Sequence, residues 1–129
     1  MRTIKYPLML VTALFAISAN AEILLKDNTE ILGKWKVYAE AAALDKEKSD
    51  LNVEWEFKAD GVLNTLSKDT RGRTGSFDIP LKYSIVDGAI KKQSTPGREK
   101  YETCIVVEKT GSEMIIKCKF LYYFMKKGS

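Results

Sequence analysis

Apolar and polar side chains alternate along most of the chain from residue 33 onward, and short turn sequences interrupt the alternation. A period of two predicts antiparallel strands with one buried and one exposed face. The clearest strands run over residues 33–38 and 51–58. Their apolar side chains are Trp35 and Val37 in the first strand, and Leu51, Val53, Trp55 and Phe57 in the second. Each strand therefore has one face suited to a core.

Glycine turns join these alternating segments into hairpins. They stand at Asp60-Gly61, Asp87-Gly88 and Thr110-Gly111. Glycine takes the positive φ that tight hairpin turns require. The turns predict further strands over 62–66, 81–85, 89–90, 101–108 and 114–125. Successive hairpins in a short chain favour an up-and-down meander.

The last hairpin permits a prediction of register. A two-residue turn at Thr110-Gly111 places Val107 opposite Met114, and it continues to Tyr101 opposite Phe120. The inner face then carries Tyr101, Thr103, Ile105 and Val107 on one strand, and Met114, Ile116, Cys118 and Phe120 on the other. On this prediction the same inner face continues through Tyr122 and Phe124.

Three stretches break the alternation. Residues 40–50 contain three consecutive alanines and several charges, which favour a brief helix or a lid-like loop. Residues 67–80 are polar, but Phe77 and Ile79 alternate near their end and predict another short strand. Residues 93–100 contain a Pro-Gly turn. Seven or eight strands result, and closure into a small antiparallel barrel is the simplest way to remove sheet edges.

The N-terminal residues 1–21 have the three parts of a secretory signal: a basic start, an apolar run and an Ala-Asn-Ala ending. The apolar run is shorter than the roughly 20 residues that cross a bilayer. Cleavage would leave residues 22–129 as one periplasmic or secreted domain without a membrane span, expected to be a monomer. Arg2 and Lys5 leave with the signal, so 19 basic and 17 acidic residues remain, a net charge of +2. This balance argues against nucleic acid as a partner.

The first predicted strand opens with Gly33-Lys34-Trp35, and here the chain resembles the lipocalin and lipocalin-like families. The spacing of later segments also resembles bacterial lipocalin-like domains: Trp55-Glu56-Phe57, Gly75-Ser76-Phe77, the run 83–88 and the C-terminal run 122–127. The resemblance implies an all-β up-and-down barrel in which Trp35 plugs the closed end. It also implies a basic residue over that tryptophan, for which Lys119 and Lys126 are both candidates.

Aromatic side chains are expected to converge on the barrel interior. An apolar pocket with a few polar groups is the usual form of a small-molecule site, although side chains can also fill a barrel of this size completely. Arginines in the 67–80 loop could bind an anionic group at the barrel mouth, or they could simply be solvated. The candidate ligand-binding residues are Trp35, Val53, Trp55, Phe57, Phe77, Tyr83, Tyr101, Tyr122, Phe124, Arg71 and Arg73.

Cys104 and Cys118 are the only cysteines, and an exported chain meets oxidising conditions, so a disulfide is expected between them. The register above opposes the bridge because it places the two residues on different faces. A bulge or a three-residue turn would shift the pairing and bring both to one face.

Catalysis has little support in the sequence. The chain has no histidine, which removes the commonest general base and the commonest metal ligand. We expect no enzymatic activity, cofactor or metal. The favoured function is binding of a small apolar or amphipathic molecule in the barrel. The alternative is a protein-interaction module, such as an inhibitor, an immunity protein or an accessory factor of an exported partner, with a filled barrel.

Overall fold

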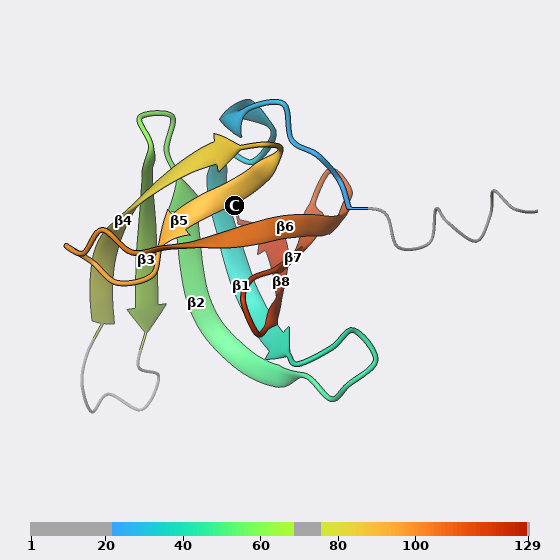
Figure 1. Cartoon of the computed structure of the whole chain (residues 1–129). Coiled ribbons are helices and arrows are strands. Elements are labelled where there is room, and N and C mark those ends of the chain that lie inside the picture. Colours follow the sequence, from blue (N-terminus) through green and yellow to red (C-terminus); the bar gives the residue numbers. More distant parts are fainter. Residues whose placement is uncertain (1–21, 69–75, 129) are drawn as a thin grey trace, which may run out of the picture.

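The computed structural model describes residues 22–68 and 76–128, and it omits the side chains of residues 68, 76 and 77. Antiparallel strands in sequence order form a closed barrel, because the first strand pairs with the last (Figure 1). The strands are β1 (Gly33–Ala41), β2 (Ser49–Phe57), β3 (Val62–Lys68), β4 (Ser76–Val86), β5 (Ala89–Gln93), β6 (Tyr101–Lys109), β7 (Glu113–Lys117) and β8 (Tyr122–Lys127). The predicted fold class, an all-β up-and-down barrel, is confirmed.

Two of the three predicted hairpins form where glycine takes a positive φ, whereas Gly111 at the third predicted turn does not take one. Gly61 joins β2 to β3 with φ at 90°. Asp87 and Gly88 both have positive φ, at 52° and 83°, and join β4 to β5. A pair of positive φ values is what a tight turn between twisted strands needs.

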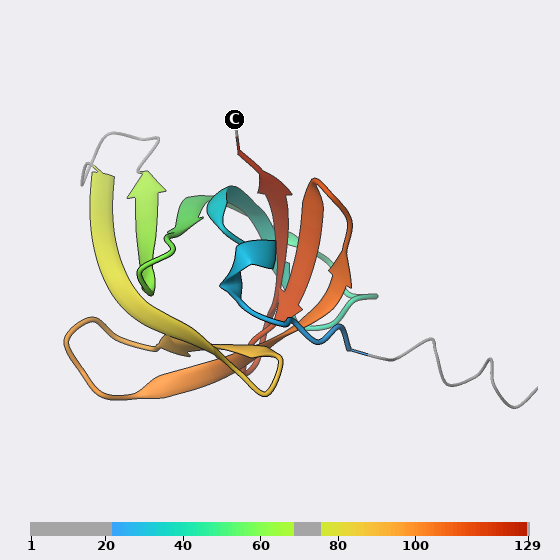
Figure 2. The same cartoon turned by 90° about the horizontal axis from the view of Figure 1, so that it is seen from above.

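A segment before β1 covers one end of the barrel (Figure 2). It contains a single 3-10 turn, η1 (Asn28–Glu30), and its Ile31 is completely buried. The segment is tied to the barrel by backbone hydrogen bonds from Ile23 to Val106 and from Leu25 to Gly88. We call this the closed end. We call the opposite end, with the β1–β2, β5–β6 and β7–β8 connections, the open end.

Two predictions about irregular segments are refined by the structure. Residues 42–48 form a loop between β1 and β2, so the predicted loop is confirmed over a shorter range and the predicted helix is wrong. The alternation at Ile79 belongs to the long strand β4, which passes through Pro80. Proline is tolerated there because β5 pairs with β4 only from Tyr83 onward. Among the described residues, no helix is long and apolar enough to cross a membrane.

The predicted register of β6 and β7 is wrong. Lys109 instead of Val107 lies opposite Met114, and a bulge between Val106 and Glu108 then pairs Val106 with Ile116. A bulge adds one residue to one strand and reverses which side chains face inward beyond it. Cys104 and Val106 are therefore completely buried in β6, whereas Ile105 is only half-buried.

The predicted single strand over 114–125 is also divided. A turn closed by the hydrogen bond from Cys118 N to Leu121 O separates β7 from β8. As a result Tyr123 and Met125 pack on the core, whereas Tyr122 and Phe124 belong to a separate apolar cluster with Ala39. The prediction that Tyr122 and Phe124 face inward is wrong.

Candidate ligand site inside the barrel

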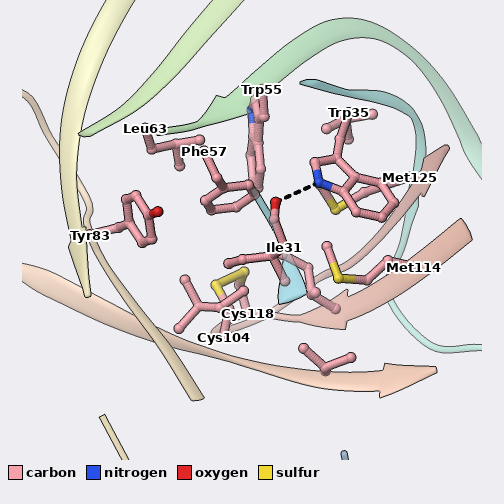
Figure 3. Close-up of a cluster of buried hydrophobic side chains, with 14 of the residues drawn as sticks. Ile31, Trp35, Trp55, Phe57, Leu63, Tyr83, Cys104, Met114, Cys118 and Met125 are labelled. Atoms are coloured by element: carbon pink, nitrogen blue, oxygen red, sulfur yellow. Dashed lines mark hydrogen bonds between the residues drawn. A yellow bond between two sulfur atoms is a disulfide. The ribbon is translucent and has the colours of Figure 1, made fainter. Parts of the chain in front are cut away.

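The closed end of the interior is sealed around Trp35. This side chain is 1% exposed, and its indole N–H donates to the carbonyl of Ile31 at 2.9 Å (Figure 3). A buried tryptophan needs such a partner for its only polar atom. Phe57, Leu63 and Met125 pack in the same core cluster with less than 2% exposure each.

A lysine covers Trp35, but it is neither of the predicted ones. Lys127 Nζ lies 4.4 Å from the Trp35 ring centroid and donates to the carbonyl of Leu32 at 2.6 Å. Lys126 instead lies over Tyr38, and Lys119 over Phe120. Burial lowers the pKa of Lys127, with a smaller contribution from Lys109. Lys127 thus links the last strand to the segment that closes the barrel.

The predicted disulfide between Cys104 and Cys118 is confirmed. Their Cα atoms are 4.1 Å apart, and both side chains are buried in the core (Figure 3). The bulge after Val106 is what brings both residues to the inner face, because the ladder beyond it pairs Ile105 with Lys117. Glu102 lies close enough to form a three-donor group with the two sulfurs, but both sulfurs are already bonded to each other.

The interior toward the open end is less tightly closed. Trp55 is 7% exposed, and its ring centroid lies 5.5 Å from that of Tyr123, whose strand β8 flanks β1 on the other side from β2. Leu51, Val53 and Tyr123 pack against the core but stay partly exposed. We call this part of the interior the open half. Its apolar walls remain accessible, which is what a bound molecule would need.

A charged pair lies inside the open half. Lys92 Nζ donates to a Glu102 carboxylate oxygen at 2.6 Å, and the two side chains are only 9% and 22% exposed. Lys92 is opposite the core residue Tyr83 in the ladder, which places it on the inner face. Its ammonium also lies 5.4 Å from the centroid of Trp55. Buried charges persist only when they are paired in this way.

A second carboxylate lies on the inner face of the same half. Glu40 is the ladder partner of Tyr123, so both side chains lie on the inner face. Glu40 is half-buried. Burial raises the pKa of Tyr123, and the negative charges of Glu40 and Glu102 raise it further. The Tyr123 hydroxyl is therefore held neutral beside two carboxylates.

The predicted ligand residues divide into three groups. The core cluster contains Trp35, Trp55, Phe57 and Tyr83, and Val53 packs against it. The outer face carries Tyr101, Tyr122 and Phe124, so the prediction that these rings converge inside is wrong for them. The loop arginines Arg71 and Arg73 lie outside the described residues, as does the side chain of Phe77.

The outward rings of β1 and β8 form a small cluster of their own. Phe124 is only 4% exposed because Lys48 lies 4.3 Å above its ring and Tyr38 packs beside it. Tyr38, Lys48, Ile115 and Phe124 line a hollow of about 320 Å³ on this outer face. The bulge between Val37 and Ala39 produces the cluster, because it turns Ala39 outward beside Phe124.

Sequence reasoning missed Lys92, Glu102 and Glu40. Each is a charged residue within an alternating strand, and such positions are typical of a solvated face. For Glu102 and Glu40, the bulges in β6 and β1 reverse the face that uninterrupted alternation would predict. Lys92 follows Ile90 by two residues, and this spacing was the only available signal that it faces inward.

The fold is similar to that of bacterial proteins of known structure. A lipocalin-like protein from Bacteroides uniformis has a TM-score of 0.63 and 16% identity, over 77% of this chain and 99% of that one. An uncharacterized protein from Bacteroides eggerthii has a TM-score of 0.60 and 15% identity, over 75% of this chain and 98% of that one. No protein-family model and no curated protein matches the chain. The fold is lipocalin-like.

Proposed function

We propose that the protein is an exported binding protein that holds a small amphipathic molecule in the open half of its barrel. The observation that carries the proposal is the contrast within one interior. Trp35 is sealed at the closed end, whereas Leu51, Val53 and Tyr123 remain partly exposed around the buried Lys92–Glu102 pair. The lipocalin-like fold supports the same function.

Export is supported by the signal-like pattern of residues 1–21 and by the disulfide. Disulfides persist mainly in extracytoplasmic compartments. A periplasmic or secreted location also suits a binding protein that takes up molecules from outside the cytoplasm.

The chemistry of the open half suits a molecule with two parts. Burial of an apolar chain against Leu51, Val53 and Trp55 would contribute about 25 cal/mol for each Å² removed from water. The polar part would lie near Lys92 and Glu102, whose remaining hydrogen-bonding capacity can orient it. Apolar walls with a few fixed polar groups are the usual composition of a small-molecule site.

Titration of the purified protein with environment-sensitive dyes and long-chain amphiphiles tests the proposal. We expect saturable binding of one probe per barrel. Val53→Arg places a charge on the inner wall and should abolish binding, whereas Asn52→Arg is the matched control because Asn52 is exposed on the same strand. Circular dichroism checks that both variants fold. If no probe binds the unsubstituted protein in a saturable way, the proposal is wrong.

The outer cluster favours a second candidate function, recognition of a protein partner. Buried aromatic residues beside a hollow are typical of surfaces that accept an anchoring side chain. Here Tyr38 and Phe124 flank such a hollow. Co-purification with one stoichiometric partner, lost in Phe124→Ala and retained in Val53→Arg, would favour this function over ligand binding.

A further inference from the structure

From the charges and rings inside the open half, we infer that the bound molecule carries a cationic head group, such as a quaternary or protonated amine. The inference rests on the proposed function, because it names the chemical class of molecule that the open half takes. It depends on the placement of Glu40 beside Tyr123, on the Trp55–Tyr123 ring pair and on the neutralisation of Lys92 by Glu102.

The described part of the open half has an excess of negative charge. Within the described strands, the charged side chains at inward-facing positions of this half are Glu40, Glu102 and Lys92. Lys92 and Glu102 are bonded to each other at 2.6 Å and offset each other's charge. Within the described ranges, no lysine or arginine nitrogen lies within 4.0 Å of a Glu40 carboxylate oxygen. The negative charge of Glu40 is therefore left for a bound cation to offset.

Aromatic rings stand next to this carboxylate. Tyr123 is the ladder partner of Glu40, and Trp55 faces Tyr123 with ring centroids 5.5 Å apart and an interplanar angle of 52°. Ring faces attract cations through their quadrupole, and tryptophan does so most strongly. Trp55 already has a cation near its face, because Lys92 Nζ lies 5.4 Å from its centroid. Rings and a carboxylate together form the kind of site that holds an ammonium group.

An anionic head group fits the same space poorly. It would approach Glu40 and Glu102, and like charges in a partly desolvated site repel each other strongly. Lys92 would attract an anionic group only weakly, because the Glu102 carboxylate already offsets its positive charge. Burial is the main reason that the pKa of Tyr123 is raised, and the negative charges of Glu40 and Glu102 raise it further.

A matched series of amphiphiles tests the inference. Decyltrimethylammonium, decyl maltoside and decanoate share one apolar chain and differ in head-group charge. Each is titrated below its critical micelle concentration, and dissociation constants are measured by calorimetry. We expect the cation to bind roughly tenfold more tightly than decanoate, a ratio typical of a partly desolvated cation–π and carboxylate site.

Glu40→Gln should reduce that preference several-fold without loss of the fold. Glu54→Gln is the control, because Glu54 pairs with Lys36 on the outer face of the same barrel. If decanoate or decyl maltoside binds as tightly as the cation, or if Glu40→Gln leaves the preference unchanged, the inference is wrong and the proposed function stands. If none of the amphiphiles binds, the proposed function itself fails.

Discussion

Trp35 and Trp55 are ladder partners on β1 and β2, and both point into the barrel, yet their surroundings differ. Trp35 donates to Ile31, lies under Lys127 and is sealed by the segment before β1. Trp55 faces Tyr123 and the ammonium of Lys92. The barrel thus places one tryptophan in a structural plug and the other in a mixed aromatic and charged site.

This contrast shows how a small barrel can combine stability with an accessible interior. The closed end gains an additional layer of packing from Ile31 and Leu25, which β strands alone do not supply. The open half keeps buried charges, which contribute little net stability and are costly when one partner is removed. Stability and binding should therefore respond to different substitutions.

The largest expected effect is on stability at the closed end. Trp35→Ala should lower the free energy of unfolding by about 3 to 5 kcal/mol, because it leaves a cavity and removes the partner of the Ile31 carbonyl. Urea unfolding followed by circular dichroism measures this loss. If Trp55→Ala destabilises the protein more than Trp35→Ala does, the two ends do not differ as proposed.

The disulfide joins Cys104 of β6 to Cys118, which directly follows β7. Its residues are separated by 14 positions in the sequence, and closure of a loop of this size contributes about 3 kcal/mol by restricting the unfolded chain. Cys104→Ala combined with Cys118→Ala should show this loss in urea unfolding. Unchanged stability would contradict the entropic account.

Lys127 should matter less, and only at the closed end. Lys127→Met removes the cation over Trp35 and the hydrogen bond to Leu32, at a cost of about 1 kcal/mol. Lys119→Met is the control, because Lys119 lies over the exposed ring of Phe120. Equal losses in the two variants, measured by thermal unfolding, would show that Lys127 has no special role in closure.

The smallest expected effect is a pH dependence at Tyr83. Its hydroxyl donates to the carbonyl of Lys58 and accepts from Asn28, and burial is the main reason that its pKa is raised. Because the unfolded tyrosine loses its proton first, its stabilising effect is complete below pH 10 or so and declines as the pH rises through the folded pKa.

Tyr83→Phe should accordingly cost about 1 kcal/mol at neutral pH, and its deficit should shrink at alkaline pH. Urea unfolding of both proteins across this range measures the difference. A deficit that stays constant or grows with pH would contradict the assignment of this hydroxyl as a neutral donor in the closed end.

The alternating pattern predicted most of the fold and about half of the site. Trp35 and Trp55 were placed inside because their strands alternate without interruption up to Val37 and through Phe57. The bulge in β6 and the turn before β8 could not be predicted, because no glycine or proline marks either place. A single inserted residue reverses every face beyond it, so Tyr122 and Phe124 were assigned inward.

The charged residues of the site were missed for a related reason. Local sequence shows that Lys92 and Glu102 are polar, but only the ladder between β5 and β6 shows that they bond to each other inside the barrel. Burial of a charge depends on a partner from another strand, and alternation along one strand carries no information about that partner.

The position of the ligand can be tested with the two tryptophans, which are the only ones in the chain. Tryptophan emission is recorded during titration with the tightest-binding decyl amphiphile. We predict that Trp35→Phe, which retains Trp55, keeps the full ligand-induced change, and that Trp55→Phe loses it. A change that persists in Trp55→Phe and disappears in Trp35→Phe would place the ligand at the closed end and contradict the account.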